Sequence, residues 1–150
     1  MAKQVNTGVQ FAVSAALPAT YDAAGYAALT YTPVGEVLSI GEFGGSADEV
    51  QSQPLATGVT EFFRGFVQYG NPSLGLERDT NDAGQNIIKE HFDGAQTGNA
   101  FSAQVTLPDG EIVYMDVRAF SYNVNIGSAN SMIGSTANLR VNRVPIYVAA

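Results

Sequence analysis

The sequence predicts one domain that is mainly β-structure with a single well-marked helix. The chain has 150 residues, the size of one ordinary domain, so we expect residues 1–150 to fold together. Its 45% hydrophobic content supplies enough apolar material for a core, which excludes wholesale disorder. Apolar residues mostly recur at every second position, as in half-buried strands, and a helical stripe is clear only at residues 82–92.

The first half of the chain holds three candidate strands, at residues 10–15, 31–40 and 60–69. Gly65 lies inside the third candidate and predicts a bulge or a close approach of another backbone. A short helical turn is expected over residues 22–29.

A polar connection fills residues 41–60 and is rich in Gly, Ser, Asp and Gln. Loops of this length without structure are uncommon in compact domains and usually bind something or are disordered. We therefore expect a long extended loop here.

The predicted helix has recognisable ends. Asp82 can cap its first turn, with Gln85 three residues later, and Gly94 ends it. The apolar stripe that packs the helix comprises Ile87, Ile88, His91 and Phe92.

A β-hairpin follows the helix. Residues 101–107 alternate between apolar and polar, Pro108-Asp109-Gly110 supplies a turn, and a second strand spans residues 111–126. The apolar positions of this second strand change face near its middle, which predicts a bulge or a far half that buries its opposite face. Sixteen residues would extend about 53 Å, longer than a compact domain of roughly 40 Å, so the strand bends or projects.

Two smaller features complete the β-structure. Asp116 and Arg118 are two residues apart on one face of the long strand, where they could form an ion pair or a solvated pair that protects an edge. The last strand is expected at residues 137–148, after a Gly/Ser/Asn-rich loop at residues 127–135.

Composition excludes several kinds of chemistry. A net charge of −7 offers no basic surplus for nucleic-acid phosphates, and the absence of cysteine excludes disulfides and thiolate metal sites. The segment from Asp79 to Glu90 fits part of a calcium loop, but Ala83 offers no side-chain oxygen where a ligand is needed. His91 is expected to be structural. We expect no catalytic residues, no metal, no cofactor and no membrane insertion.

The order and spacing of several motifs resemble those of the tail tube proteins of tailed bacteriophages, especially phages with long non-contractile tails. The motifs are Val34-Gly35-Glu36-Val37, Phe43-Gly44-Gly45, Pro54-Leu55-Ala56-Thr57-Gly58, Gly65, residues 79–85, Leu107-Pro108-Asp109-Gly110 and the C-terminal strand run. The resemblance implies a β-sandwich or barrel-like fold with a flanking helix. It also implies six-copy rings that stack into a tube through which DNA passes without specific binding.

The resemblance further implies where copies meet. Residues 41–60 would be a ring-stacking arm, with Glu42, Asp48 and Glu49 at the stacking contacts. A sheet shared between subunits would include Asp116, Arg118, Phe120 and Tyr122. Further partners would be a tape-measure protein and the tail terminator and initiator proteins, with synthesis in a bacterial cytoplasm and a final place in the virion.

Two other functions remain open at this stage. A related secretion-system tube would share the resemblance but pass effectors. A small-ligand β-barrel would be a discrete monomer with an apolar cavity. An enzyme is the least favoured class.

Overall fold

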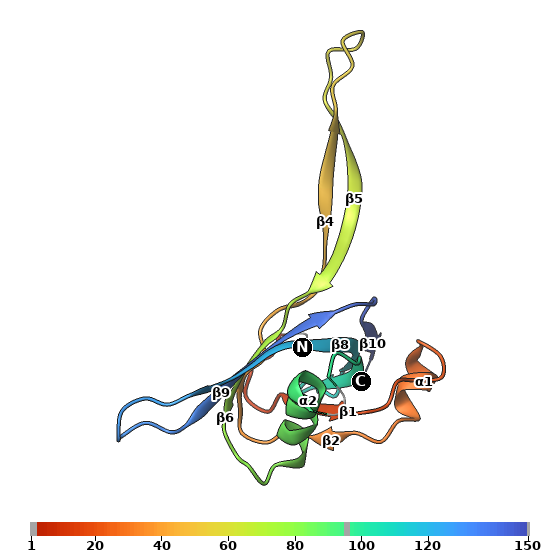
Figure 1. Ribbon diagram of the computed structural model, residues 1–150. Coiled ribbons are helices and arrows are strands. Elements are labelled where there is room, and N and C mark those ends of the chain that lie inside the picture. The colour runs from red at the N-terminus through yellow and green to blue at the C-terminus, as the bar shows by residue number, and fades with distance from the viewer. Residues whose placement is uncertain (1–2, 95–96, 150) are drawn as a thin grey trace.

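The computed structural model describes residues 3–94 and 97–149, and its described part is mainly antiparallel β-structure (Figure 1). The elements are β1 (Gln10–Ser14), α1 (Ala23–Ala27), β2 (Thr32–Pro33), β3 (Val37–Ser39), β4 (Phe43–Ser52), β5 (Glu61–Gly70), β6 (Ser73–Glu77), α2 (Ala83–Asp93), β7 (Phe101–Thr106), β8 (Ile112–Asn125), β9 (Gly134–Val141) and β10 (Ile146–Val148). Eight strands form one sheet in the order β2-β1-β7-β8-β9-β6-β3, with β10 paired to β8, while β4 and β5 form a separate ribbon. The expectation of a mainly β fold with a flanking helix is confirmed.

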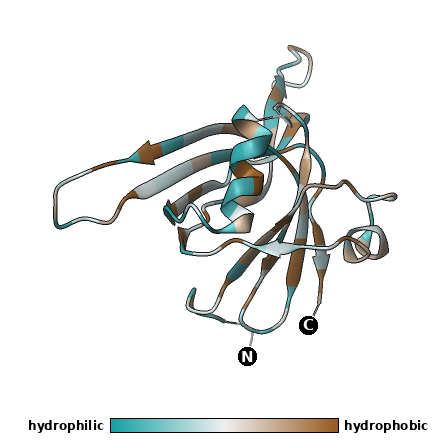
Figure 2. Cartoon of the chain, turned by 60° about the horizontal axis from the view of Figure 1, so that its bottom comes forward, coloured by the Kyte–Doolittle hydropathy of each residue, from teal (hydrophilic) through white to brown (hydrophobic). Residues whose placement is uncertain are grey.

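The core lies on one face of the large sheet, and α2 packs against that face. Figure 2 shows the helix lying across the strands. Buried side chains from β1, β6, β7, β8 and β9 meet here with Ile88 of the helix. The fully buried strand residues of this core include Phe101, Met115 and Leu74. Burying such side chains is the main favourable term in folding.

The start of α2 is fixed by polar contacts. The Asp82 carboxylate accepts hydrogen bonds from the backbone N–H of Gln85 at 2.9 Å and of Gly35 at 3.1 Å. The buried Gln85 side chain does not return to Asp82; it donates to the carbonyls of Gly35 and Glu77 instead. The predicted cap is therefore confirmed, and the same residues tie the helix to the loop between β2 and β3 and to the end of β6.

The predicted hairpin is confirmed as β7 and β8. Gly110 has a φ of 99°, and the N–H of Leu107 donates to the carbonyl of Glu111 at 2.8 Å across the turn. Glycine takes this positive φ without the steric cost that a Cβ would add.

The change of face in β8 arises from a bulge at Phe120. Ala119 lies opposite Leu139 and Ser121 lies opposite Asn138, so Phe120 is the extra residue on β8. Beyond the bulge, β8 and β9 leave the body together as a projecting hairpin (Figures 1 and 2). The length of this strand predicted that it either bends or projects beyond the body, and the structure shows that it projects.

Two predicted strands are interrupted. The segment 31–40 contains β2 and β3, separated at Glu36, whose φ of 59° is left-handed and breaks a strand. The segment 137–148 contains the end of β9 and all of β10, which pair with different stretches of β8.

A strand of the sheet interior was not predicted. β6 has only five residues, but Leu74 and Leu76 are fully buried in the core. It lies between β9 and β3, where both of its edges are paired.

The expectation of a loop at residues 41–60 is wrong for its first half. Residues 43–52 form β4, which pairs antiparallel with β5, so the segment is one side of a hairpin. The hairpin, which we call the arm (residues 43–70), extends away from the body in Figure 1. The bulge predicted at Gly65 is confirmed, because the register shifts by one residue opposite Asp48.

Candidate assembly surfaces

The arm is a two-stranded ribbon, and no third strand of the described residues pairs with it. Its strands have ten residues each, which gives a length of about 33 Å. Almost every residue between Gly45 and Gln68 is exposed. Isolated two-stranded ribbons are marginally stable in water, so this one is a surface that another molecule would stabilise by covering it.

Both faces of the arm carry aromatic side chains. Phe63 lies opposite Val50 on one face, and Phe62 lies opposite Gln51 on the other. The exposed fractions are 61% for Phe62, 54% for Phe63 and 85% for Phe66. Exposed apolar clusters of this kind mark interaction sites. Sequence reasoning placed this strand but missed its exposed aromatic side chains; the signal was two adjacent phenylalanines, which a strand must turn to opposite faces.

The three acids predicted for ring stacking all lie on or beside the arm and are exposed. Glu42 is at its root, directly before β4, whereas Asp48 and Glu49 are midway along the strand. Six residues of extended chain separate Glu42 from Asp48 by about 20 Å. Glu49 is paired in register with Arg64 of β5. The structure therefore places Glu42 at the root of the arm and Asp48 and Glu49 in its middle, so the three acids do not form one cluster.

The projecting β8–β9 hairpin is a second exposed surface. β7 pairs with β8 only as far as Val117, so in the described part of the chain one edge of β8 has no strand beside it along its outer half. Phe120 on this half is 57% exposed, and Tyr122 is half-buried against the core. Around the loop at its end, Ile126, Met132 and Ile133 are exposed. An unpaired edge beside apolar side chains is a ready pairing site for another strand.

The ion pair considered between Asp116 and Arg118 does not form. Asp116 lies on the face opposite the main core, is 5% exposed, and forms an ion pair with Nε of Arg143 at 3.2 Å. Arg118 is exposed and donates to the carbonyl of Gly98. A buried carboxylate needs a partner at contact distance, and the loop between β9 and β10 supplies one.

Asp116 lies in a cluster of tyrosines that holds α1 against β8. Tyr26 stacks on Tyr114 with ring centroids 5.4 Å apart, and the Arg143 guanidinium lies 3.7 Å from the centroid of the Tyr21 ring. Burial raises the pKa of Tyr26 to about 12, and the nearby Asp116 charge acts in the same direction. Burial also raises the pKa of Asp116, against the opposing effect of Arg143. This side of the sheet is thus a second packed layer, which explains why Asp116 is withdrawn from the surface.

The helix residues singled out for packing differ in depth. Ile88 is fully buried, Ile87 is half-buried against the core, and Phe92 is half-buried. His91 is also buried; its Nδ1 is 2.8 Å from the carbonyl oxygen of Ile87, and its ring packs on Phe101. Through these contacts His91 packs the helix against the sheet.

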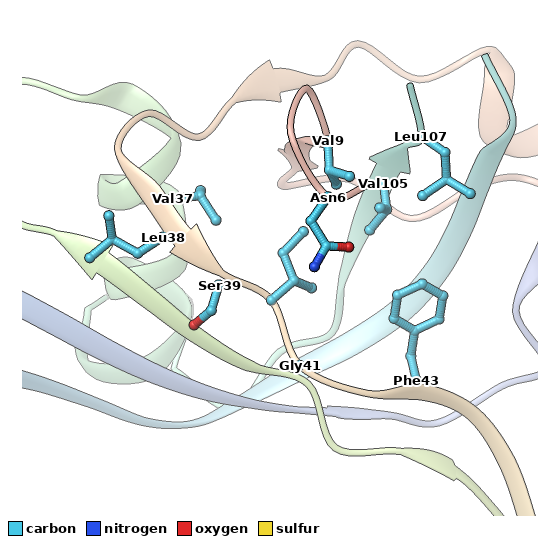
Figure 3. A pocket seen from close by; sticks show the side chains of 10 residues that line it. Asn6, Val9, Val37, Leu38, Ser39, Gly41, Phe43, Val105 and Leu107 are labelled. Atoms are coloured by element: carbon cyan, nitrogen blue, oxygen red, sulfur yellow. The ribbon is translucent and has the colours of Figure 1, made fainter. Parts of the chain in front are cut away.

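A hollow of about 340 Å³, lined by both polar and apolar residues, lies at the root of the arm. Figure 3 shows its lining side chains, which come from the N-terminal segment, β3, the start of β4 and the end of β7. The lining residues are Asn6, Val9, Val37, Leu38, Ser39, Ile40, Gly41, Phe43, Val105 and Leu107. None of them is charged.

Within residues 3–94 and 97–149, no group of three or more His, Asp or Glu side chains could hold a metal ion. Around the partial calcium motif, Asp82 is engaged as the helix cap, and the Asp79 carboxylate accepts the N–H of Asn81. Neither described helix has the length and apolar character needed to cross a membrane.

Comparisons with known proteins show what this fold is similar to. No family model and no curated protein matches the chain. Among solved structures, a chain from the tail of an empty gene transfer agent particle matches with a TM-score of 0.68 at 16% identity, covering 98% of this chain and 100% of that one. A chain of the anti-feeding prophage baseplate matches with a TM-score of 0.71 at 9% identity, covering 99% and 98%. The SPP1 tail tube matches with a TM-score of 0.61 at 13% identity, covering 95% and 77%. The chain therefore has the fold seen in tail tubes, and the expected β-rich tail-tube fold is confirmed.

Proposed function

We propose that this protein is the structural subunit of a phage tail tube. Six copies form a ring, rings stack into a hollow tube, and the tube is the conduit for genomic DNA from the virion into the host. The protein has a structural rather than a catalytic role. Its final place is the virion tail, after synthesis in the cytoplasm of a bacterial host.

The arm is the observation that carries this proposal. A ribbon about 33 Å long with phenylalanines exposed on both faces is a poor surface for a free monomer. It is well suited to lie between neighbouring copies, where both faces are covered. Residues 41–60, with Glu42, Asp48 and Glu49, belong to this contact between stacked rings.

The projecting β8–β9 hairpin supports contacts within a ring. Its unpaired edge lets the sheet continue into a neighbouring subunit through main-chain hydrogen bonds, as β-augmentation requires. Arg118, Phe120 and Tyr122 lie on this outer half and take part in the shared sheet. Asp116 is buried under α1, so its contribution is to hold Arg143 and the outer layer of its own subunit.

Charge supports passage of DNA without binding. A net charge of −7 gives a surface that repels phosphates, so DNA slides through the bore. Specific partners would be other copies, a tape-measure protein inside the growing tube, and terminator and initiator proteins at its ends.

A second candidate is the inner tube of an injection system that passes effectors. The similarity to the anti-feeding prophage baseplate chain, which extends over 99% of this chain, supports this second candidate. The tail tube of a DNA-carrying phage would contain a tape-measure protein and be attached to a capsid. The inner tube of an injection system would instead co-purify with a sheath protein. Mass spectrometry of particles that contain this protein distinguishes the two.

Electron microscopy of the concentrated protein, with size-exclusion chromatography and light scattering, tests the proposal. Hollow tubes or stacked six-fold rings support it. A folded protein that remains strictly monomeric at millimolar concentration contradicts self-assembly and favours a small-ligand barrel.

A further inference from the structure

The tyrosine cluster between α1 and β8 contains three buried polar atoms that have no hydrogen-bond partner among the described residues. They are the hydroxyls of Tyr26 and Tyr31 and the Oδ1 atom of Asp116. Tyr26 is 1% exposed and Asp116 is 5% exposed, so neither side chain is open to bulk solvent. Leaving such a group unsatisfied costs free energy, and native proteins rarely do so. These atoms therefore need a partner that their own chain does not supply.

Tyr26 and Asp116 lie close together on the outer face of the sheet. The Tyr26 ring stacks on the Tyr114 ring with centroids 5.4 Å apart, and Tyr114 is two residues before Asp116 on the same face of β8. Burial raises the pKa of Tyr26, and the charge of Asp116 raises it further. The two groups thus interact electrostatically, although no direct hydrogen bond joins them.

The neighbouring side chains do not satisfy the second oxygen of Asp116. Nε of Arg143 lies 3.2 Å from Oδ2, which leaves Oδ1 of the same carboxylate without a partner. Arg118 donates to the carbonyl of Gly98 instead. Tyr31 belongs to the other side of the cluster: burial raises its pKa, with smaller effects from Tyr114 and Tyr26 and none from Asp116. The pair to be satisfied is therefore Tyr26 and Asp116.

The two unpartnered atoms are complementary to one small molecule that both donates and accepts hydrogen bonds. A carboxylate oxygen accepts, whereas a phenol can donate as well as accept. Water meets both needs, because it can donate a hydrogen to Asp116 Oδ1 and accept the hydrogen of the Tyr26 hydroxyl. Buried waters in proteins occupy polar sites of this kind and bond to groups that the protein leaves unsatisfied. A water in such a bridge is nearly as favourable in enthalpy as a direct hydrogen bond.

We infer that an ordered water molecule binds between the Tyr26 hydroxyl of α1 and the Oδ1 atom of Asp116 in β8. The bridge adds to the stacked rings of Tyr26 and Tyr114 in holding α1 against the outer face of the sheet. It belongs to the single subunit, so it does not depend on the proposed function.

A crystal structure of the wild-type protein that shows ordered solvent tests the inference directly. We expect one water within about 3.2 Å of both Tyr26 Oη and Asp116 Oδ1. A direct contact between these two atoms, or two side chains that stay apart with no water between them, overturns the inference.

The Tyr26→Phe variant tests it in solution, because this change removes only the hydroxyl. If the hydroxyl bonds to a water that Asp116 also holds, its loss should raise the equilibrium constant for unfolding by about 5-fold to 10-fold in urea titrations. If the hydroxyl has no partner, its removal leaves the constant unchanged or lowers it, which contradicts the bridge. Tyr21→Phe is the matched control: Tyr21 packs on Tyr26 in the same cluster but is 37% exposed, and its change should stay below about 2-fold.

A double-mutant cycle shows whether the hydroxyl acts through Asp116. In an Asp116→Ala background the effect of Tyr26→Phe should fall below about 2-fold, because one end of the bridge is already missing. An effect of the same size in both backgrounds means that the hydroxyl is satisfied elsewhere, and it overturns the inference. Should Asp116→Ala fail to fold, the crystal structure and the single Tyr26→Phe variant still decide the question.

Discussion

Replacing Phe66 on the arm with serine should weaken assembly without weakening the fold. Phe66 is 85% exposed, so it contributes little to the stability of the monomer, and surface changes of this kind usually alter it by less than about 0.5 kcal/mol. A phenylalanine buries about 200 Å² when fully covered. The exposed part of Phe66 therefore offers about 170 Å² to a partner, worth up to about 4 kcal/mol.

Ordering of the Phe66 side chain and incomplete coverage of its ring offset part of this value. We expect a net loss of about 2 kcal/mol per subunit contact, which corresponds to roughly a 30-fold higher critical concentration for assembly. Light scattering across a dilution series measures that concentration, and urea unfolding of the dilute protein measures stability.

Phe101→Ala is the matched control, because Phe101 is fully buried. It should lower the free energy of unfolding by about 3–5 kcal/mol. The reasoning is refuted if Phe66→Ser destabilises the monomer as strongly as Phe101→Ala, or if its critical concentration equals that of the wild type.

Three further predictions concern the fold. Gly84→Ala should lower the free energy of unfolding by about 1–3 kcal/mol, measured in urea, because its Cβ would lie 2.4 Å from the carbonyl oxygen of Pro33; an unchanged midpoint would contradict this packing. Asp82→Ala should cost about 1–2 kcal/mol through loss of the helix cap, and a loss of helical circular dichroism without any change in midpoint would argue otherwise. Burial raises the pKa of Asp116, so the stabilisation from its protonated form is complete below pH 3.8 and is lost as pH rises through the higher pKa of the folded state. Asp116→Asn should therefore gain stability relative to the wild type between pH 4 and pH 7 in urea titrations; an equal difference at both pH values would show that the Arg143 pair cancels the burial cost.

The parts of the fold that sequence reasoning predicted are those with local signals. The β7–β8 hairpin has strict alternation and a Pro-Asp-Gly turn, and α2 has a capping aspartate and an ending glycine. Each signal acts within a few residues of its effect.

The parts that it missed depend on distant partners. β4 is polar and rich in glycine, and it is a strand because β5 pairs with it. β6 has two leucines in five residues, too short a pattern to stand out before β9 and β3 enclose it. Asp116 finds Arg143 across the sheet rather than its sequence neighbour, and no spacing rule could have indicated that choice.

β8 also has a mechanical consequence. It is one continuous strand from the centre of the body to the end of the projection, with β7 on one side of its inner half and β10 and then β9 on the other. Its ladder hydrogen bonds run perpendicular to the strand. A pull on the projecting end is therefore carried along the backbone and loads these bonds in shear, all at once, rather than unzipping them one by one. Force applied at the projecting end is therefore spread over the inner ladder, so the strand that forms the projection is also anchored in the sheet of the body.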